Sequence, residues 1–427
     1  MRSRATATSL HCKRHDAAMK AAGAALLLLA SSLHAQPLPM LGGVEVPGYA
    51  HASAAATGPI ASHAAGAAEL APDGAIRRAM TADTPVRIAS ISKLVVALAI
   101  ARLADAGKLS LDDDAGRHLG WPLRNPAHPD AAISIRMLLR HSSGLSDAGG
   151  YSIPLGQPLQ SHLGPASWSK AAPGTAFDYA NIGFPVLAQI IERITGERFD
   201  RAARSLVLDP LGVDACFNWS GCTPETIARG AVLYRKAPSS DGPWNAAGPW
   251  FAQVDAVRPA ACPVRAAADG NCALDAYVPG TNGGLFGPQG GLRISVVDLA
   301  KIGQALLQTD GRFLRPQTLD MLFTPRATEQ PGQGEETDLR LMQYWSEGGL
   351  HCFSGTGQNG GDQPLAPKPM AGCGHLGEAY GLRSALIIDR AAGRVNAHAF
   401  TGTSQIPPAG KVSRFSEPEE ALFALAN

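Results

Sequence analysis

The stretch that decides the fold is Arg87-Ile-Ala-Ser90-Ile-Ser-Lys93, which is followed by an apolar run that extends to Leu103. Apolar side chains on most faces predict a helix in the middle of the protein, beginning at Ser90 and ending near Gly107. The spacing places Ser90 and Lys93 on one face of that helix. A serine hydroxyl becomes a good nucleophile when a base takes its proton, and burial lowers the pKa of a lysine toward that task. The stretch therefore predicts a buried helix that carries a serine nucleophile and its base.

Two further segments carry polar residues that suit such a site. Tyr179-Ala-Asn181 precedes a predicted helix that Asn181 could cap, and His375-Leu-Gly377 leads into a predicted strand. A phenol near Lys93 can relay a proton to a leaving group, an amide can hold a substrate carbonyl, and a glycine lets a substrate lie close to an edge strand. Taken alone, each segment fits a structural role better: a packed tyrosine, a helix cap and a surface histidine.

Other catalytic motifs are absent from the sequence or have a simpler interpretation. There is no Gly-x-Ser-x-Gly elbow, no His-Glu-x-x-His and no phosphate-binding loop, so no metal or cofactor is predicted. A second Ser-x-x-Lys, Ser167-Trp-Ser-Lys170, lies beside a Pro-Gly turn and opens no apolar helix, so we interpret it as a chance match. The glycine cluster at residues 283–291 predicts turns that line a cleft.

Taken in order along the chain, the three motifs resemble those of the penicillin-recognising serine hydrolases. Three supporting phrases match as well: Arg136-Met-Leu-Leu-Arg-His-Ser-Ser-Gly144, Pro173-Gly-Thr175 and Gly290-Gly-Leu292. The resemblance covers residues 46–401 and is closest to the class C β-lactamase-like group. That group also contains DD-peptidases, D-amino-acid-specific peptidases and β-lactamase-fold esterases. The resemblance implies a mixed α/β part with a helical domain beside it and an active site in the cleft.

The resemblance also implies a role for each motif residue. Ser90 would be the acylated nucleophile, Lys93 its base or proton relay, and Tyr179 the acid/base partner. The backbone N–H groups of Ser90 and Glu378 would form the oxyanion hole, which stabilises the negative charge of the transition state. The implied substrate contacts are Asn181, His375 and Gly377.

Departures from the family pattern bear on the substrate. His375 stands where many members have lysine, as is common in DD-peptidases and esterases of the group. Leu376 stands where a hydroxyl residue usually helps to bind a substrate carboxylate, Arg383 could compensate, and Glu378 could repel an anionic ligand. We therefore expect an ester or D-amino-acid peptide substrate, and rank β-lactamase or penicillin-binding DD-carboxypeptidase activity below it. A non-catalytic binding or sensor protein of the same fold is the alternative from another class.

The first 35 residues have the pattern of an export signal. Lys20 precedes a small apolar run at residues 21–33, and Ser32-Leu-His-Ala35 offers a cleavage site before Gln36. Met19 would be a neater start than Met1. The segment predicts a periplasmic or secreted protein that is cleaved after Ala35.

The cysteines support export. Removing the leader removes Cys12 and leaves six cysteines, an even number that falls into local pairs. Disulfides require an oxidising compartment, and the rival interpretation, zinc, lacks a Cys-x-x-Cys pair. The hypothesised disulfides are Cys216–Cys222, Cys262–Cys272 and Cys352–Cys373.

Composition narrows the class of protein. The 427 residues are 45% hydrophobic and 17% charged, with a net charge of +1. These values exclude a disordered chain and a nucleic-acid partner. The resemblance implies a small-molecule or peptide substrate. No apolar run reaches the roughly 18 residues of a membrane span.

The pattern of predicted elements indicates an α+β fold. Short strands at residues 46–86 and strands at 384–389 and 395–401 enclose predicted helices, which suggests one sheet built from both termini with an inserted helical region. We expect one β-lactamase-like domain over residues 36–427, with its α/β part at about 40–110 and 290–427 and its helical and loop part at about 111–289. Further predicted helices are Ile135–Leu139, capped by Ser134, Val296–Leu307, with a capping box of Ser295 and Asp298, and 417–426. Residues 237–291 predict a long ordered loop.

Overall fold

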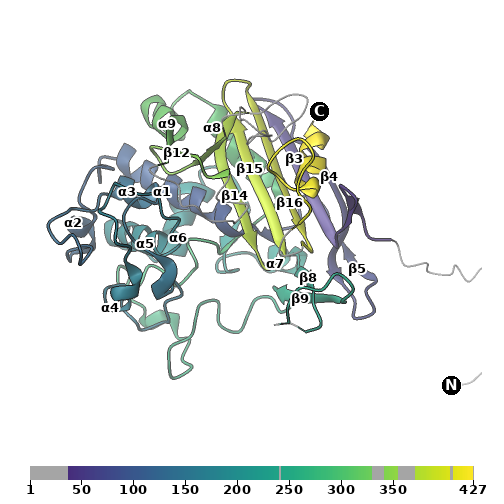
Figure 1. The fold of residues 1–427 in the computed structure, drawn as a ribbon, viewed down its shortest axis with the longest axis horizontal. Coiled ribbons are helices and arrows are strands. Elements are labelled where there is room, and N and C mark those ends of the chain that lie inside the picture. Colours follow the sequence, from purple (N-terminus) through teal and green to yellow (C-terminus); the bar gives the residue numbers. More distant parts are fainter. Residues whose placement is uncertain (1–36, 240–241, 329–340, 354–370, 404–406, 427) are drawn as a thin grey trace, which may run out of the picture. The chain divides into compact units, whose positions relative to one another are not determined.

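The fold is taken from a computed structural model that describes residues 37–239, 242–328, 341–353, 371–403 and 407–426 (Figure 1). The predicted signal segment, with Cys12, lies outside the described residues. Within these ranges no helix combines the length and the apolar character that crossing a membrane requires.

One large antiparallel sheet combines strands from both ends of the described chain (Figure 1). Its nine strands lie in the order β11 (Pro325–Ala327), β12 (Tyr344–Ser346), β13 (His351–Phe353), β14 (Gly372–Ala379), β15 (Leu382–Asp389), β16 (Arg394–Thr401), β3 (Gly48–Ala55), β4 (Ala61–Leu70) and β5 (Ile76–Ala79). The C-terminal β16 pairs with the N-terminal β3, with Arg394 opposite Ala55 and Phe400 opposite Tyr49. The sheet confirms the predicted α+β fold.

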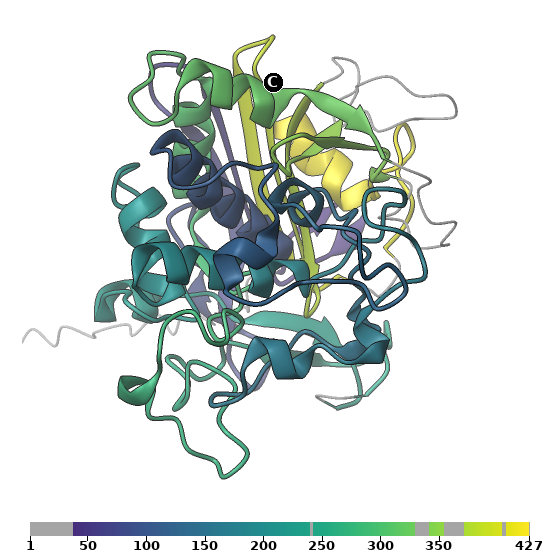
Figure 2. The same cartoon turned by 90° about the vertical axis from the view of Figure 1, so that its left-hand side faces the viewer.

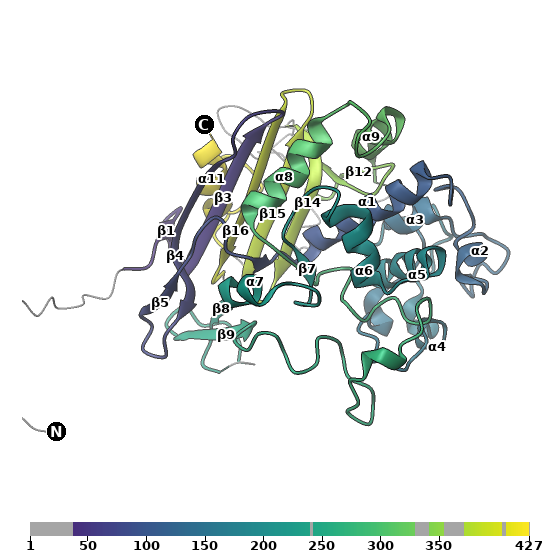
Figure 3. The same cartoon turned by 180° about the vertical axis from the view of Figure 1, so that it is seen from behind.

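The central strand β15 is buried along its whole length because both faces of the sheet are covered. Leu386 belongs to the main core, where α8 (Val296–Leu307) contacts β15, β16 and β3. The neighbouring Ile387 points the other way and belongs to a cluster with Phe423 of α11 (Glu417–Phe423). Figures 1 and 3 show α8 and α11 on opposite faces of the sheet. Burial on both faces explains the unbroken apolar run at residues 385–388 of this strand.

Most of the remaining helices gather beside the β14 side of the sheet (Figures 1 and 2), whereas α7 (Pro224–Arg229) lies near β8 (Leu233–Lys236). Helix α1 (Ser92–Asp105) is buried over most of its length and contacts α5 (Gly183–Thr195). Helix α5 in turn contacts α2 (Ala115–Leu119), α3 (Ile135–Leu139) and α6 (Phe199–Ala203). The other described helices are α4 (Leu159–His162) and α9 (Pro316–Phe323).

Three small sheets complete the described fold. A sheet of β6 (Val86–Arg87), β10 (Leu292–Ile294) and β7 (Cys216–Phe217) lies directly before the turn that carries Ser90. The pairs β1 (Met40–Leu41) with β2 (Val44–Glu45) and β8 (Leu233–Lys236) with β9 (Trp250–Val254) form the others. The strand β9 lies within the segment that the sequence predicts as a loop.

Two predicted helix starts are wrong. Ser90 lies in a 3-10 turn, Ala89–Ile91, and the α-helix begins only at Ser92. Asn181 does not cap α5 with its side chain, because its amide bonds elsewhere and Ile182 occupies the capping position.

Other local predictions hold more closely. The caps at Ser134 and Ser295 are confirmed, since each hydroxyl accepts a backbone N–H from the first turn of its helix. The strands β3 and β4 are longer than predicted, at eight and ten residues. The last predicted helix is α at Glu417–Phe423 and continues as a 3-10 turn. The six cysteines form the three predicted disulfides.

Candidate active site

Ser90 is held in a constrained turn at the start of α1. The residue before it, Ala89, has a φ of +48°, in the left-handed region that non-glycine residues rarely adopt. The Ser92 hydroxyl donates to the Ala89 carbonyl at 2.6 Å and accepts the Leu292 N–H at 3.0 Å. These bonds tie the turn to β10. Backbone strain of this kind persists only where the surroundings enforce it, and it is concentrated at functional sites.

The Lys93 ammonium group lies directly beside Ser90. Its Nζ donates to Ser90 Oγ at 2.9 Å, to Asn181 Oδ1 at 2.8 Å and to the Gln289 carbonyl at 2.9 Å. The side chain is 0% exposed, and this burial lowers the pKa of Lys93 to about 7, although the charge of Asp147 opposes the shift. At neutral pH a large share of Lys93 is therefore neutral and able to accept a proton.

Tyr179 lies against the same lysine. The Lys93 Nζ is 4.9 Å from the centre of the Tyr179 ring. Trp345 lies edge-on to this ring at 6.1 Å, and His141 stacks on it at 4.3 Å while its Nδ1 accepts the Ala180 N–H at 3.1 Å. Burial, followed by the charge of Lys93, lowers the pKa of His141 well below its usual value, so His141 is neutral. His141 thus positions Tyr179 without adding charge.

Asp147 holds the Asn181 side chain in place. Its carboxylate accepts the Asn181 N–H at 2.9 Å, the Asn181 side-chain N–H at 2.8 Å and the Ile182 N–H at 2.9 Å. The Asn181 amide thereby turns its oxygen toward Lys93. The sequence analysis missed this aspartate, which lies three residues beyond the phrase that ends at Gly144.

Strand β14 lies close against the Ser90 turn. The Ser384 hydroxyl donates to the Ile88 carbonyl at 3.0 Å, and a Cβ at Gly377 would collide with that carbonyl oxygen and with Ser384 Oγ. Only glycine fits position 377 without moving the strand. Glu378, the next residue, lines the same pockets as Ser90. The oxyanion hole of Ser90 and Glu378 stays a prediction.

His375, the expected substrate contact, is buried behind the residues that line the two pockets beside Ser90. It is 1% exposed, and the lining of the two pockets beside Ser90 does not include it. Its ring lies edge-on to Trp345 at 5.6 Å, and its Nδ1 donates to the Leu376 carbonyl at 2.5 Å. Burial, and then the charge of Lys93, lowers the pKa of His375 well below its usual value. The ring is therefore neutral, and it is buried close enough to Lys93 to feel its charge.

Two pockets meet at Ser90. The larger has a volume of about 860 Å³ and the smaller about 530 Å³, and Ser90, Asn181 and Glu378 line both. Tyr179 lines only the smaller one. A nucleophile between two cavities can receive the two halves of a substrate on either side of the bond that breaks.

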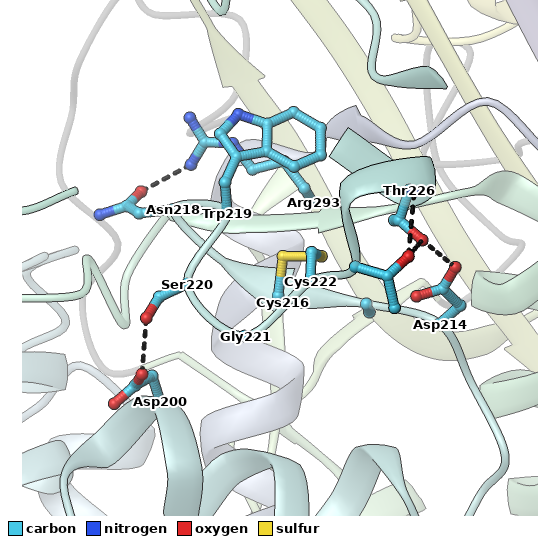
Figure 4. Close-up of a disulfide and its surroundings, with 12 residues drawn as sticks. Asp200, Asp214, Cys216, Asn218, Trp219, Ser220, Gly221, Cys222, Thr226 and Arg293 are labelled. Atoms are coloured by element: carbon cyan, nitrogen blue, oxygen red, sulfur yellow. Dashed lines mark hydrogen bonds between the residues drawn. A yellow bond between two sulfur atoms is a disulfide. The ribbon is translucent and has the colours of Figure 1, made fainter. Parts of the chain in front are cut away.

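The Cys216–Cys222 disulfide lies beside a residue that lines the larger pocket, and Figure 4 shows its surroundings. The bridge Cys216–Cys222 closes the turn that carries Asn218, which lines this pocket. The Arg293 guanidinium donates to Asn218 Oδ1 at 2.6 Å, as Figure 4 shows. Asn218 and Trp219 both have positive φ angles, so the bridge and the arginine together hold a turn that a free chain would disfavour.

Comparison with known proteins identifies the family. The family model described as Beta-lactamase matches residues 42–415. The chain belongs to this family. The match confirms the predicted resemblance and, at the level of the family, the predicted class of enzyme: serine hydrolases of the β-lactamase fold.

Curated relatives in this family match over part of their length. Esterase EstB of Burkholderia gladioli is 34% identical over 173 residues, which cover 35% of this chain and 42% of the esterase. The D-alanyl-D-alanine-carboxypeptidase/endopeptidase AmpH of Escherichia coli K12 is 28% identical over 139 residues, 31% of this chain and 36% of the relative. The matches thus span less than half of each relative.

Solved structures share the β-lactamase fold over most of the chain. D-amino acid amidase from Ochrobactrum anthropi SV3, complexed with D-phenylalanine, has a TM-score of 0.60 and 22% identity, and the match covers 89% of this chain and 93% of the amidase. The octameric penicillin-binding protein homologue from Pyrococcus abyssi has a TM-score of 0.61 and 21% identity, covering 89% and 73%.

The family's usual carboxylate-binding position is altered here. Leu376 lines the smaller pocket and supplies no hydroxyl. Arg383, the residue that could compensate, donates to Glu378 at 2.8 Å and lies 3.5 Å from Glu419. Its positive charge is therefore already matched by two carboxylates.

Proposed function

We propose that the protein is an exported serine hydrolase that acts on esters or on peptides of the D-amino-acid type through an acyl-enzyme on Ser90. The observation that carries this proposal is the 2.9 Å hydrogen bond between the buried Lys93 Nζ and Ser90 Oγ. A lysine with a pKa of about 7 beside a serine is a base matched to its task at neutral pH.

The proposed reaction has two steps that balance. In the first, Ser90 Oγ loses its proton to neutral Lys93 and bonds to the acyl carbon, the bond to the leaving group breaks, and the leaving group takes a proton from Tyr179. In the second, water loses a proton to the Tyr179 phenolate and bonds to the acyl carbon, the bond between that carbon and Ser90 Oγ breaks, and Ser90 Oγ takes back its proton from Lys93, so that the acid is released and all three side chains are restored. The backbone N–H groups of Ser90 and Glu378 would stabilise the oxyanion in both steps.

Penicillin recognition, as a β-lactamase or a DD-carboxypeptidase, is the second candidate. The family assignment and the similarity to AmpH favour it. Two residues disfavour it. Leu376 has no hydroxyl that could bind a substrate carboxylate, and the Arg383 guanidinium is already ion-paired with Glu378. A non-catalytic sensor of this fold would not need Ser90, Lys93 and Tyr179 in contact, so we place it third.

A substrate panel tests the proposal. Wild type and Ser90→Ala are compared on p-nitrophenyl butyrate, on D-amino-acid amides and on a chromogenic cephalosporin. We expect turnover of the ester or of an amide by the wild type and a fall of at least about 10³-fold in Ser90→Ala. Equal turnover by both proteins would contradict the mechanism, and faster loss of the cephalosporin would replace the first candidate with the second.

Export is part of the same proposal. Three disulfides are stable only in an oxidising compartment, and this supports a periplasmic or secreted location. The full chain is expressed in a bacterium and the exported protein is sequenced from its N-terminus. We expect the exported protein to begin at Gln36. Retention of the uncleaved chain in the cytoplasm would contradict export.

A further inference from the structure

The smaller pocket beside Ser90 has an excess of negative charge. One guanidinium lines it, that of Arg383, against four carboxyl groups: Asp147, Asp178, Glu378 and Glu419. Three of these carboxylates have clear partners. Asp147 accepts the N–H groups of Asn181 and Ile182, and the two glutamates face Arg383.

Asp178 is the exception. Its backbone N–H donates to the His141 carbonyl at 2.8 Å, but among the described residues no hydrogen-bond donor or cation reaches its carboxylate. The side chain is half-buried, and burial raises the pKa of Asp178, with a further rise from the negative charge of Asp147. An unpaired carboxylate in a partly buried site is costly, and a ligand cation in the pocket would remove that cost.

The chemistry of the pocket favours an organic cation. No group of three or more histidine, cysteine or acidic side chains among the described residues is arranged to hold a metal ion. Met342 and Leu376 add apolar surface to the same wall. A positively charged nitrogen that carries carbon substituents would contact both kinds of surface.

The position of Tyr179 indicates which half of a substrate enters here. Tyr179 is the proposed acid that protonates the leaving group, and it lines the smaller pocket but is absent from the lining of the larger one. The leaving group therefore belongs in the smaller pocket, and the acyl group in the larger.

We propose that the smaller pocket selects alcohol or amine leaving groups that carry a positively charged nitrogen, and that Asp178 is the residue that determines this specificity. The inference rests on the proposed function, because it assumes acylation of Ser90. It also accounts for Leu376: a pocket that receives a cation has no use for a carboxylate-binding hydroxyl.

A pair of isosteric esters tests the inference. Butyrylcholine and 3,3-dimethylbutyl butyrate have leaving groups of the same shape, which differ in charge at one atom. We expect kcat/KM to favour the choline ester by roughly tenfold in wild type at low ionic strength, and to favour it much less in about 1 M salt, where charges are screened beyond about 3 Å. In Asp178→Asn the two esters are expected to react at similar rates.

Two variants serve as controls. Asp178→Glu keeps the charge and is expected to keep the preference, whereas Asp130→Asn changes an exposed carboxylate outside the pockets and is expected to change nothing. Equal rates for the two esters in wild type, or a preference that survives Asp178→Asn, would overturn the inference while p-nitrophenyl butyrate is still hydrolysed through Ser90. If the wild-type protein hydrolysed none of these esters, both the proposed function and the inference would be overturned.

Discussion

The Asp147 carboxylate accepts both the backbone N–H and the side-chain N–H of Asn181, at 2.9 and 2.8 Å. The remaining polar atom of the Asn181 amide, Oδ1, accepts a hydrogen bond from Lys93. Asp147 therefore fixes the direction of this amide and, through Ile182, the entry into α5. Asp147 therefore positions Lys93, the proposed base, through the Asn181 amide.

Replacing this anchor should cost both stability and activity. In Asp147→Ala three N–H groups lose a charged acceptor, so we expect the free energy of unfolding to fall by about 1.5–3 kcal/mol, together with lower turnover. Urea denaturation measures the first effect and ester hydrolysis the second. Asp130→Ala removes an exposed carboxylate and is the matched control. Unfolding curves that coincide for the two variants would show that Asp147 anchors nothing.

The pH dependence of acylation follows from Lys93. Only its deprotonated form can take the Ser90 proton, so kcat/KM is expected to rise with pH through the Lys93 pKa of about 7 and then to level off. In Asp147→Asn a negative charge that raises this pKa is removed, and the rising limb should shift to lower pH. A pH–rate profile of both proteins is the measurement. If kcat/KM instead rose around the ordinary lysine pKa of about 10.4, the result would contradict the proposal that burial lowers the pKa of Lys93.

Gly377 is predicted to tolerate no side chain. In Gly377→Ala the new Cβ meets the Ile88 carbonyl and Ser384 Oγ, so β14 must move away from the Ser90 turn. We expect about 1–3 kcal/mol lower stability and a large loss of turnover. Gly164→Ala, where a Cβ meets no atom within 4 Å, is the control. Full activity in Gly377→Ala would show that the close approach of β14 is unimportant.

The disulfides can be checked chemically. The unreduced protein, denatured and alkylated, should yield peptides in which Cys216 is joined to Cys222, Cys262 to Cys272 and Cys352 to Cys373. Reduction before alkylation should release all six thiols. Six alkylated cysteines without reduction would remove the disulfides and weaken the proposal of export.

Local patterns in the sequence predicted the parts of the site that depend on local geometry. Ser90 and Lys93 lie one turn apart, so their contact follows from spacing alone. The strands β15 and β16 and the caps at Ser134 and Ser295 are likewise set by residues close in sequence.

Contacts between distant segments were not predictable in this way. The Gln289 carbonyl reaches Lys93 across nearly two hundred residues, and the Asp147 and Asn181 pair joins two loops. The short strands β12 and β13 carry too few residues for a period to be recognised. The cap assigned to Asn181 was wrong for the same reason, because a buried lysine from another helix competes for its side chain.

The most direct test of the central claim is to locate the acyl group. The protein is mixed with p-nitrophenyl butyrate, quenched in acid during the first turnover, and its peptides are mapped by mass spectrometry. The account predicts one butyryl group on the peptide that contains Ser90, and none in Ser90→Ala. A butyryl group that persists in Ser90→Ala, or that lies on the second Ser-x-x-Lys at Ser167, would contradict it.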